Sequence, residues 1–230
     1  MKKIISKFLK IILPNDIYLN RRDNYLFILY SKIEFFLKTF SLRIRNFKFL
    51  FIPSKHIGSI FLLEKLSIFF KKEKIDFFLW DACLLGALRN QNAIAGSALD
   101  IDIGIIFDRK KHLNKIKSLK NEFKLKFHNN FNSVQLFHSW GTVDISLFTK
   151  KKNIIFITED VALGKETNTH NPKNYIKKKK IFKFKDFIPF KKAKIYSKKF
   201  NIPKNSILLL KKKYGRNWKI PNKKGQLYFT

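Results

Sequence analysis

Cysteine is nearly absent from this chain of 230 residues, which contains only Cys83. A single thiol excludes an internal disulfide framework and any zinc site built from several cysteines. It is compatible with a reducing cytoplasm. Hydrophobic residues make up 45% of the chain and include 26 Phe, so a sizeable core is possible and global disorder is not expected.

Long uncharged apolar runs are also missing. None reaches the roughly 20 residues that a helix needs to span a bilayer, so we do not expect a transmembrane protein. Residues 1–13 begin like a signal peptide, but Lys7 and Lys10 interrupt the apolar region and no small-residue cleavage site precedes Pro14. They predict a short basic amphipathic helix that lies on a membrane surface or on the protein itself.

Acidic residues are scarce, at 16 against 49 Lys and Arg, which gives a formal charge of +33. Such a balance favours polyanionic partners: nucleic acid, anionic lipid, or nucleotide and phosphosugar substrates. Arginine, the residue best suited to forked recognition of phosphate, contributes only seven of the 49. The joint abundance of Lys, Ile, Asn and Phe is also typical of nucleotide-composition bias, which is an alternative explanation of the charge.

The spacing of apolar residues predicts a helical, aromatic-rich segment up to about residue 73, in which core packing is favoured over membrane contact. A region of mixed structure follows. Its expected helices cover residues 82–89, 109–126 and 206–214, and its expected strands cover 75–80, 99–103, 133–137, 142–148 and 154–157. A tight turn at Gly141 joins two of these strands, 164–174 read as a polar loop, and the lysine run at 177–180 reads as a solvated patch.

Apolar and acidic residues alternate from Leu99 to Ile103, which is the period of a β-strand. Asp100 and Asp102 therefore point to the same face, with Cα atoms about 7 Å apart. Two carboxylates so close repel by roughly 2–3 kcal/mol at an effective dielectric constant of about 20. A divalent cation such as Mg²⁺ would turn that repulsion into binding and keep positions open for phosphate.

Asp144 lies in the middle of a second predicted strand, between Val143 and Ile145. A lone aspartate in a strand commonly faces solvent on the wet side of a sheet. A third carboxylate beside an Asp-x-Asp strand is also what phosphoryl transfer assisted by two metal ions requires.

Four segments together resemble the LicD/fukutin family. They are LLGALR at 84–89, DIDIG at 100–104, TVDISLF at 142–148 and YGRNWKIP at 214–221, and they occur in the family's order. The resemblance implies an α+β, nucleotidyltransferase-like fold, in which a small mixed sheet carries the carboxylates and helices surround it. The catalytic domain would cover residues 74–230, with residues 1–73 as an N-terminal helical extension.

The same resemblance implies transfer of a phospho-alcohol group, such as phosphocholine or ribitol phosphate, from a CDP-linked donor to a hydroxyl of a glycan or lipid-linked saccharide. Lipopolysaccharide is one such glycan. CMP would be released. The enzyme would work in the cytoplasm, at the inner face of the membrane, where its basic surface would suit both the donor and anionic lipid.

Site residues are implied by residue matching. Asp100, Asp102 and Asp144 would hold Mg²⁺ or Mn²⁺, and Asp144 could instead help to deprotonate the acceptor. Arg89 would contact a donor phosphate, with a surface salt bridge as the alternative. The remaining candidates for substrate contact are Gly86, Cys83, Tyr214 and Trp218. For the last two, a C-terminal anchor packed on the core is the favoured alternative. Asp81 is expected to cap a helix.

Two other hypotheses remain open. The first is a nucleotidyltransferase directed by nucleic acid, because polymerases use the same arrangement of metal and carboxylates. The YGRNWKIP segment argues against it, and we do not expect nucleic acid as a partner. The second is a non-catalytic, membrane-associated descendant of the family, suggested by Ala82, Cys83 and Ala98 at positions where the family commonly carries Gly, Thr or Ser, and an acid.

Overall fold

The computed structural model describes residues 32–41, 54–89, 100–128, 132–162, 175–195 and 198–220. The chain divides into two compact units, Met1–Ile52 and Pro53–Thr230. In the first unit, residues 32–41 form a helix on which Lys38 and Glu34 make an ion pair of 2.9 Å. The predicted amphipathic helix at 1–13, the loop at 164–174 and Ala98 lie outside the described residues.

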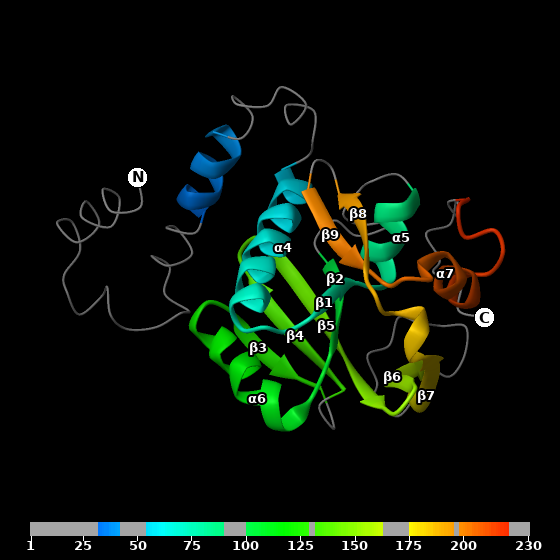
Figure 1. Ribbon diagram of the computed structural model, residues 1–230. Coiled ribbons are helices and arrows are strands. Elements are labelled where there is room, and N and C mark those ends of the chain that lie inside the picture. Colours follow the sequence, from blue (N-terminus) through cyan, green and yellow to red (C-terminus); the bar gives the residue numbers. More distant parts are fainter. Residues whose placement is uncertain are drawn as a thin grey trace. The chain divides into compact units, whose positions relative to one another are not determined.

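The second unit is built on a mixed sheet (Figure 1). Its main path runs β1(Phe77–Leu79), β2(Asp100–Ile106), β5(Gly141–Lys151), β4(Ser133–His138) and β3(Lys124–Phe127). The last residues of β5, from Thr149 to Lys151, pair with β6(Ile154–Ala162), and β6 in turn pairs with β7(Tyr175–Lys183). Of the described strand pairs, only β2 and β5 run parallel. The α+β class expected from the sequence is confirmed.

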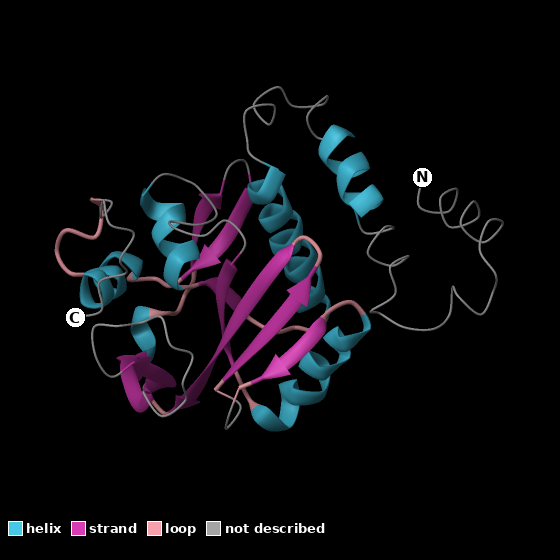
Figure 2. Cartoon of the chain, turned by 180° about the vertical axis from the view of Figure 1, so that it is seen from behind, coloured by secondary structure: helices cyan, strands magenta, loops and turns pink. Residues whose placement is uncertain are grey.

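One face of the sheet is wholly apolar. Ile101, Ile103, Val143, Ile145 and Val134 alternate with polar residues on β2, β5 and β4, and all five are completely buried. Helix α4(Ser54–Lys72) packs against β2 and β5 and covers this face. Figure 2 shows the strands from the opposite side, in front of the helix. The alternation leaves the polar residues of the same strands together on the other face.

Helix α4 belongs to the unit formed by residues 53–230, whereas the sequence analysis placed everything before residue 74 in a separate extension. The reason is the apolar stripe along α4. Ile57, Ile60, Leu63, Leu66 and Phe70 are at most 1% exposed, because they form the covering layer of the sheet. In the described part of the chain, no helix is long and apolar enough to cross a membrane.

The predicted helix over 109–126 is wrong in its second half. Helix α6(Arg109–Ser118) ends in a short 3-10 helix, Leu119–Asn121, and Lys124–Phe127 then form β3 beside β4. The buried ring of Phe123 anchors the change of direction. The predicted pair of strands on either side of Gly141 is confirmed as β4 and β5.

Three further elements complete the second unit. Helix α5(Asp81–Arg89) follows β1 directly and packs against β2. The hairpin of β8(Lys191–Ile195) and β9(Lys198–Ile202), which the sequence analysis did not anticipate, lies beside β1, where Asn201 Nδ2 donates to the Phe77 carbonyl at 3.0 Å. Helix α7(Ser206–Tyr214) packs against α5.

Candidate active site

Asp100, Asp102 and Asp144 share the polar face of the sheet. In the parallel register of β2 and β5, Asp102 lies opposite Asp144 and Asp100 lies opposite Thr142. Register partners on neighbouring strands point to the same side and are about 4.8 Å apart between strand axes. The predicted common face of Asp100 and Asp102 is therefore confirmed, and Asp144 joins them near the amino ends of both strands.

Gly104 ends the row of carboxylates on β2, and the structure explains why a glycine stands there. A Cβ atom at residue 104 would lie 2.4 Å from the Phe78 ring and 2.8 Å from the Phe148 ring. These two rings belong to an aromatic cluster that also contains Trp80, Phe182 and Phe187, with ring centroids 4.9–6.3 Å apart. The cluster closes the polar face beyond the carboxylates.

The first turn of α5 lies next to Asp102 and hydrogen-bonds to it. The backbone N–H of Ala82 donates to Asp102 Oδ2 at 3.2 Å, and the backbone N–H of Asp102 donates to Cys83 Sγ at 3.3 Å. A backbone donor serves equally well with any side chain at position 82. A helix N-terminus also carries a partial positive charge, which favours a carboxylate there.

Cys83 and Gly86, both expected to contact substrate, are buried on the inner side of α5. The Cys83 sulfur contacts the backbone of β2 instead, and burial together with the nearby Asp102 carboxylate raises the pKa of its thiol well above 9.0. In this structure both residues contact the protein interior, because they lie on the face of α5 that packs against β2.

Lys213, which the sequence analysis missed, brings a positive charge to this group. It projects from the last turn of α7, forms an ion pair with Asp81 Oδ1, and lies 6.0 Å from the Trp80 ring centroid. Its side chain is only 14% exposed. Asp81 itself takes a left-handed φ of +42° at the start of α5. Lys213 was hard to recognise from the sequence, because it is the third of three consecutive lysines and only its position on the surface of the helix distinguishes it from the other two.

The carboxylates raise one another's pKa. Burial raises the pKa of Asp102 from 3.8 to about 8, with further contributions from Asp81 and Asp144, and against the opposing effects of Lys213 and the Ala82 N–H. Burial and the charge of Asp100 raise the pKa of Asp144, against a hydrogen bond from Gln135. The site thus concentrates more negative charge than the protein neutralises.

Such a site fits a hard cation. Within the described residues, no group of three His, Cys, Asp or Glu side chains converges as metal ligands. Mg²⁺, however, is held in many phosphate-handling sites by one or two carboxylates, with water and substrate phosphate filling its other positions. The facing pair Asp102 and Asp144 offers that donor set.

Trp80 adds an unsatisfied donor next to the carboxylates. Its side chain is 4% exposed, and among the described residues no acceptor contacts Nε1. Burying an N–H group without a partner costs about 1–3 kcal/mol. Trp80 immediately precedes Asp81, and Lys213 Nζ lies 6.0 Å from its ring centroid.

The other predicted residues are Arg89, Tyr214 and Trp218. Arg89 is the last residue of the nine-residue α5, about 12 Å along the axis from Asp81. Tyr214 is half-buried at the end of α7, with its ring centroid 5.8 Å from Lys213 Nζ. Trp218 is 5% exposed, which agrees with the favoured interpretation of a C-terminal anchor.

Comparison with known proteins identifies one family. The family model described as LicD/FKTN/FKRP, nucleotidyltransferase domain, matches residues 74–205. Among solved structures, the chain is similar to lincosamide antibiotic adenylyltransferase LnuA in its lincomycin-bound form, with 18% identity and a TM-score of 0.42 over 66% of this chain and 82% of that one. No curated protein matches the chain.

Proposed function

Because this chain belongs to the LicD/FKTN/FKRP family and carries its nucleotidyltransferase domain, we propose that it transfers a phospho-alcohol group from a CDP-linked donor to a hydroxyl of a glycan or lipid-linked saccharide. Phosphocholine and ribitol phosphate are the groups we expect. The single observation that carries the proposal is the facing pair Asp102 and Asp144, whose pKa values are both raised by burial and by neighbouring carboxylates.

Asp102 and Asp144 would hold Mg²⁺ or Mn²⁺, with Asp100 beside them. When bound, the metal would offset the charges of these carboxylates and of the donor diphosphate. The protein supplies one more group for the diphosphate. The Lys213 ammonium group, whose nitrogen lies 6.0 Å from the Trp80 ring centroid, suits phosphate oxygens.

In the proposed reaction, the acceptor hydroxyl attacks the donor phosphorus distal to cytidine. The new bond joins the acceptor oxygen to that phosphorus, and the bond from phosphorus to the bridging oxygen breaks, so that CMP leaves with the electron pair. The hydroxyl proton passes to a carboxylate. Asp144 would take it in the alternative arrangement in which Asp100 and Asp102 alone hold the metal, since a carboxylate bound to a metal ion is a weaker base. Arg89 would contact a phosphate of the donor if the substrate extends along α5.

Thermal unfolding with CDP-choline, CDP-ribitol, CDP-glycerol and nucleoside triphosphates, each with and without Mg²⁺, tests the proposal. We expect one CDP-alcohol to stabilise the wild type only with Mg²⁺, and Asp102→Asn to abolish that stabilisation. Asp76→Asn is the matched control, since it removes an exposed carboxylate just before β1, whose first residue Phe77 lies opposite Ile105 and so at the other end of β2 from Asp102. An equal response of Asp102→Asn and the wild type would exclude the proposed site. Stabilisation by nucleoside triphosphates alone would favour the nucleic-acid alternative.

We also propose that the protein acts at the cytoplasmic face of a membrane as a peripheral protein. The support is on α7, which buries Leu209 and Leu210 but leaves Ile207 and Leu208 55% and 43% exposed next to Lys211 and Lys212. Apolar side chains flanked by lysines suit the boundary between anionic headgroups and acyl chains.

A further inference from the structure

An open pocket of about 730 Å³ lies at the end of the central strands opposite the carboxylates. Ile106 at the end of β2 and Thr149 in β5 belong to its lining, whereas Asp102 and Asp144 are near the start of these strands. Ile106 lies four positions along β2 from Asp102, which is about 13 Å of extended chain. The rings of Phe78 and Phe148 fill the polar face at Gly104, between the two places. The pocket is therefore separate from the proposed donor site.

The pocket collects positive charge from two parts of the chain. Arg109 and Lys111 come from the first turn of α6, and Lys150 and Lys152 come from the hairpin between β5 and β6. These four are among ten lining residues, about twice the share of Lys and Arg in the whole chain, where they are 49 of 230. The concentration exceeds what the overall basic composition alone would place there.

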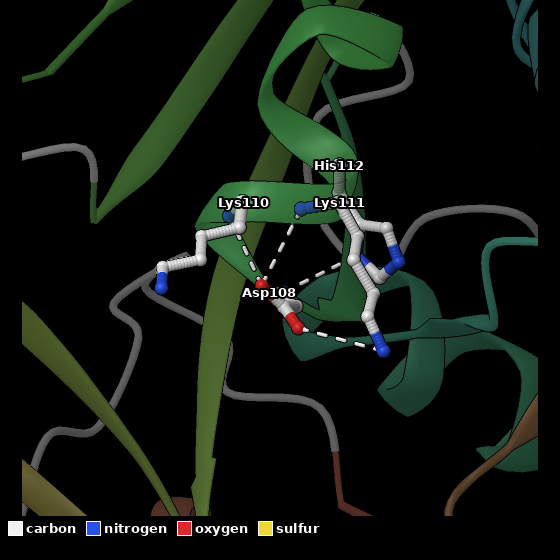
Figure 3. A network of polar contacts seen from close by, with 4 residues as sticks. All are labelled: Asp108, Lys110, Lys111 and His112. Atoms are coloured by element: carbon white, nitrogen blue, oxygen red, sulfur yellow. Dashed lines mark hydrogen bonds and ion pairs between the residues drawn. The ribbon is translucent and has the colours of Figure 1, made fainter.

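Asp108 is the one acid in the lining, and its carboxylate is already engaged (Figure 3). Oδ1 accepts from the backbone N–H groups of Lys110 at 3.0 Å and Lys111 at 3.4 Å, which caps α6. Oδ2 lies 3.9 Å from Lys111 Nζ. With one carboxylate and four cations, the pocket has a net positive charge. The backbone N–H groups at the start of α6 already donate to Asp108, so a ligand would be bound by the basic side chains instead.

His112 supports the pocket without adding charge at neutral pH. Its Nδ1 accepts from the Asp108 backbone N–H at 3.2 Å, which requires an unprotonated nitrogen. Burial lowers its pKa, and the neighbouring Lys115 and Lys111 act in the same direction against Asp108. The His112 and Phe107 rings, with centroids 6.2 Å apart, both line the pocket. Phe107 is buried and provides an apolar surface beneath the cations.

We propose that this pocket binds the phosphate group of a small organic phosphate, either a free phosphomonoester or the headgroup of a lipid. A volume of about 730 Å³ falls within the range of small-ligand sites and exceeds what one phosphate ion fills. Arg109 can engage two phosphate oxygens and the lysines can act as point charges. Lys150 Nζ lies 3.9 Å from the Phe184 ring centroid, a contact that positions the ammonium group without neutralising it. Asn132 and Thr149 offer polar groups to hydroxyls of the organic part.

Calorimetric titration of the full chain in EDTA tests the proposal, because the absence of divalent metal and of any CDP compound makes the result independent of the proposed transferase activity. The free-ligand probes are inorganic phosphate and glycerol 3-phosphate. The headgroup probe is a vesicle of phosphatidylglycerol in phosphatidylcholine. The pocket variant combines Lys111→Gln, Lys150→Gln and Lys152→Gln. The control variant combines Lys117→Gln, Lys120→Gln and Lys194→Gln, three lysines equally exposed but outside the pocket.

We expect the pocket variant to bind the preferred probe at least about tenfold more weakly and the control variant to bind within about twofold of the wild type. Preference for glycerol 3-phosphate would identify a free ligand, and preference for the vesicle a headgroup. Equal weakening in both variants would overturn the proposal, because it would show a response to total charge. The proposal would also be overturned if adding the probe changed the backbone amide chemical shifts near Asp102 but not those of Asn132 and Thr149 in nuclear magnetic resonance spectra. Unchanged circular dichroism would show that the variants fold.

Discussion

Asp102 takes part in most of the electrostatic interactions of the site. The N–H of Ala82 stabilises its charged form, while burial, Asp81 and Asp144 oppose it and raise its pKa to about 8. A carboxyl group whose pKa is higher in the folded state binds protons more tightly there than in the unfolded chain. Its contribution to stability is therefore lost as pH rises between about 4 and about 8.

We accordingly expect the metal-free protein to lose thermal stability across this pH range, with a Tm that falls by several degrees. Mg²⁺ should restore stability more at pH 8 than at pH 5, because only the ionised carboxylates bind it. Asp102→Asn should flatten the profile, and Asp76→Asn should leave it unchanged. Scanning calorimetry of the three proteins, each in EDTA and in Mg²⁺, measures these profiles. A wild-type profile as flat as that of Asp102→Asn would contradict the raised pKa.

Gly104 gives a second prediction at the same scale. Gly104→Ala places a methyl group 2.4 Å from the Phe78 ring, so we expect a loss of about 2–3 kcal/mol in the free energy of unfolding. Phe78→Leu removes the ring atoms concerned. The double variant Gly104→Ala with Phe78→Leu should therefore be more stable than the sum of the single losses predicts, and denaturant titration of the four proteins gives that coupling. Strictly additive losses would show that the ring does not dictate the glycine.

Helix α7 connects the C-terminal motif to the carboxylates through Lys213. Since this lysine pairs with Asp81 at the start of α5 and lowers the pKa of Asp102, the helix supplies charge to the site as well as packing. The exposed neighbour Lys212 shares its element and chemistry but not this position.

We expect Lys213→Met to lower stability by about 1–3 kcal/mol, because it leaves a half-buried carboxylate without its partner. We also expect the Kd of the CDP-alcohol donor to rise at least about tenfold. Lys212→Met should leave both the free energy of unfolding and the Kd of the donor close to their wild-type values. Calorimetric titration with donor and Mg²⁺, together with denaturant unfolding, separates the two effects. Loss of stability with unchanged donor affinity would restrict Lys213 to a structural role.

How far the sequence predicted these elements depended on the range of the interactions. The alternation from Leu99 to Ile103 has a period of two, so the shared face of Asp100 and Asp102 was predictable. The opposition of Asp102 and Asp144 was not, because the register of two parallel strands far apart in sequence is set by tertiary packing. For the same reason Lys213 was missed, and residues 124–126 were assigned to a helix although pairing with β4 places them in a strand.

At the scale of the whole molecule, the formal charge of +33 has to be weighed against composition bias. Bias alone would spread lysine evenly over the surface. Helix α7 departs from that expectation, because exposed Ile207 and Leu208 adjoin Lys211 and Lys212 on one short element. Charge attracts the protein to an anionic surface over about 10 Å, whereas apolar side chains hold it only on contact.

These two contributions predict different responses to salt. We expect the protein to sediment with vesicles that contain phosphatidylglycerol and not with pure phosphatidylcholine. Ile207→Ser with Leu208→Ser should weaken binding at all salt concentrations, by about three- to tenfold, because it removes the contribution that salt does not screen. Lys211→Gln with Lys212→Gln should weaken binding mainly below about 0.1 M salt. Ile68→Ser, at a residue 70% exposed on α4, is the matched control for loss of an apolar side chain. Two results would show that the attraction comes from net charge alone and that α7 does not contact the membrane. One is that the Ile68→Ser control weakens vesicle binding as much as the α7 variant does. The other is that no variant weakens vesicle binding below about 0.1 M salt.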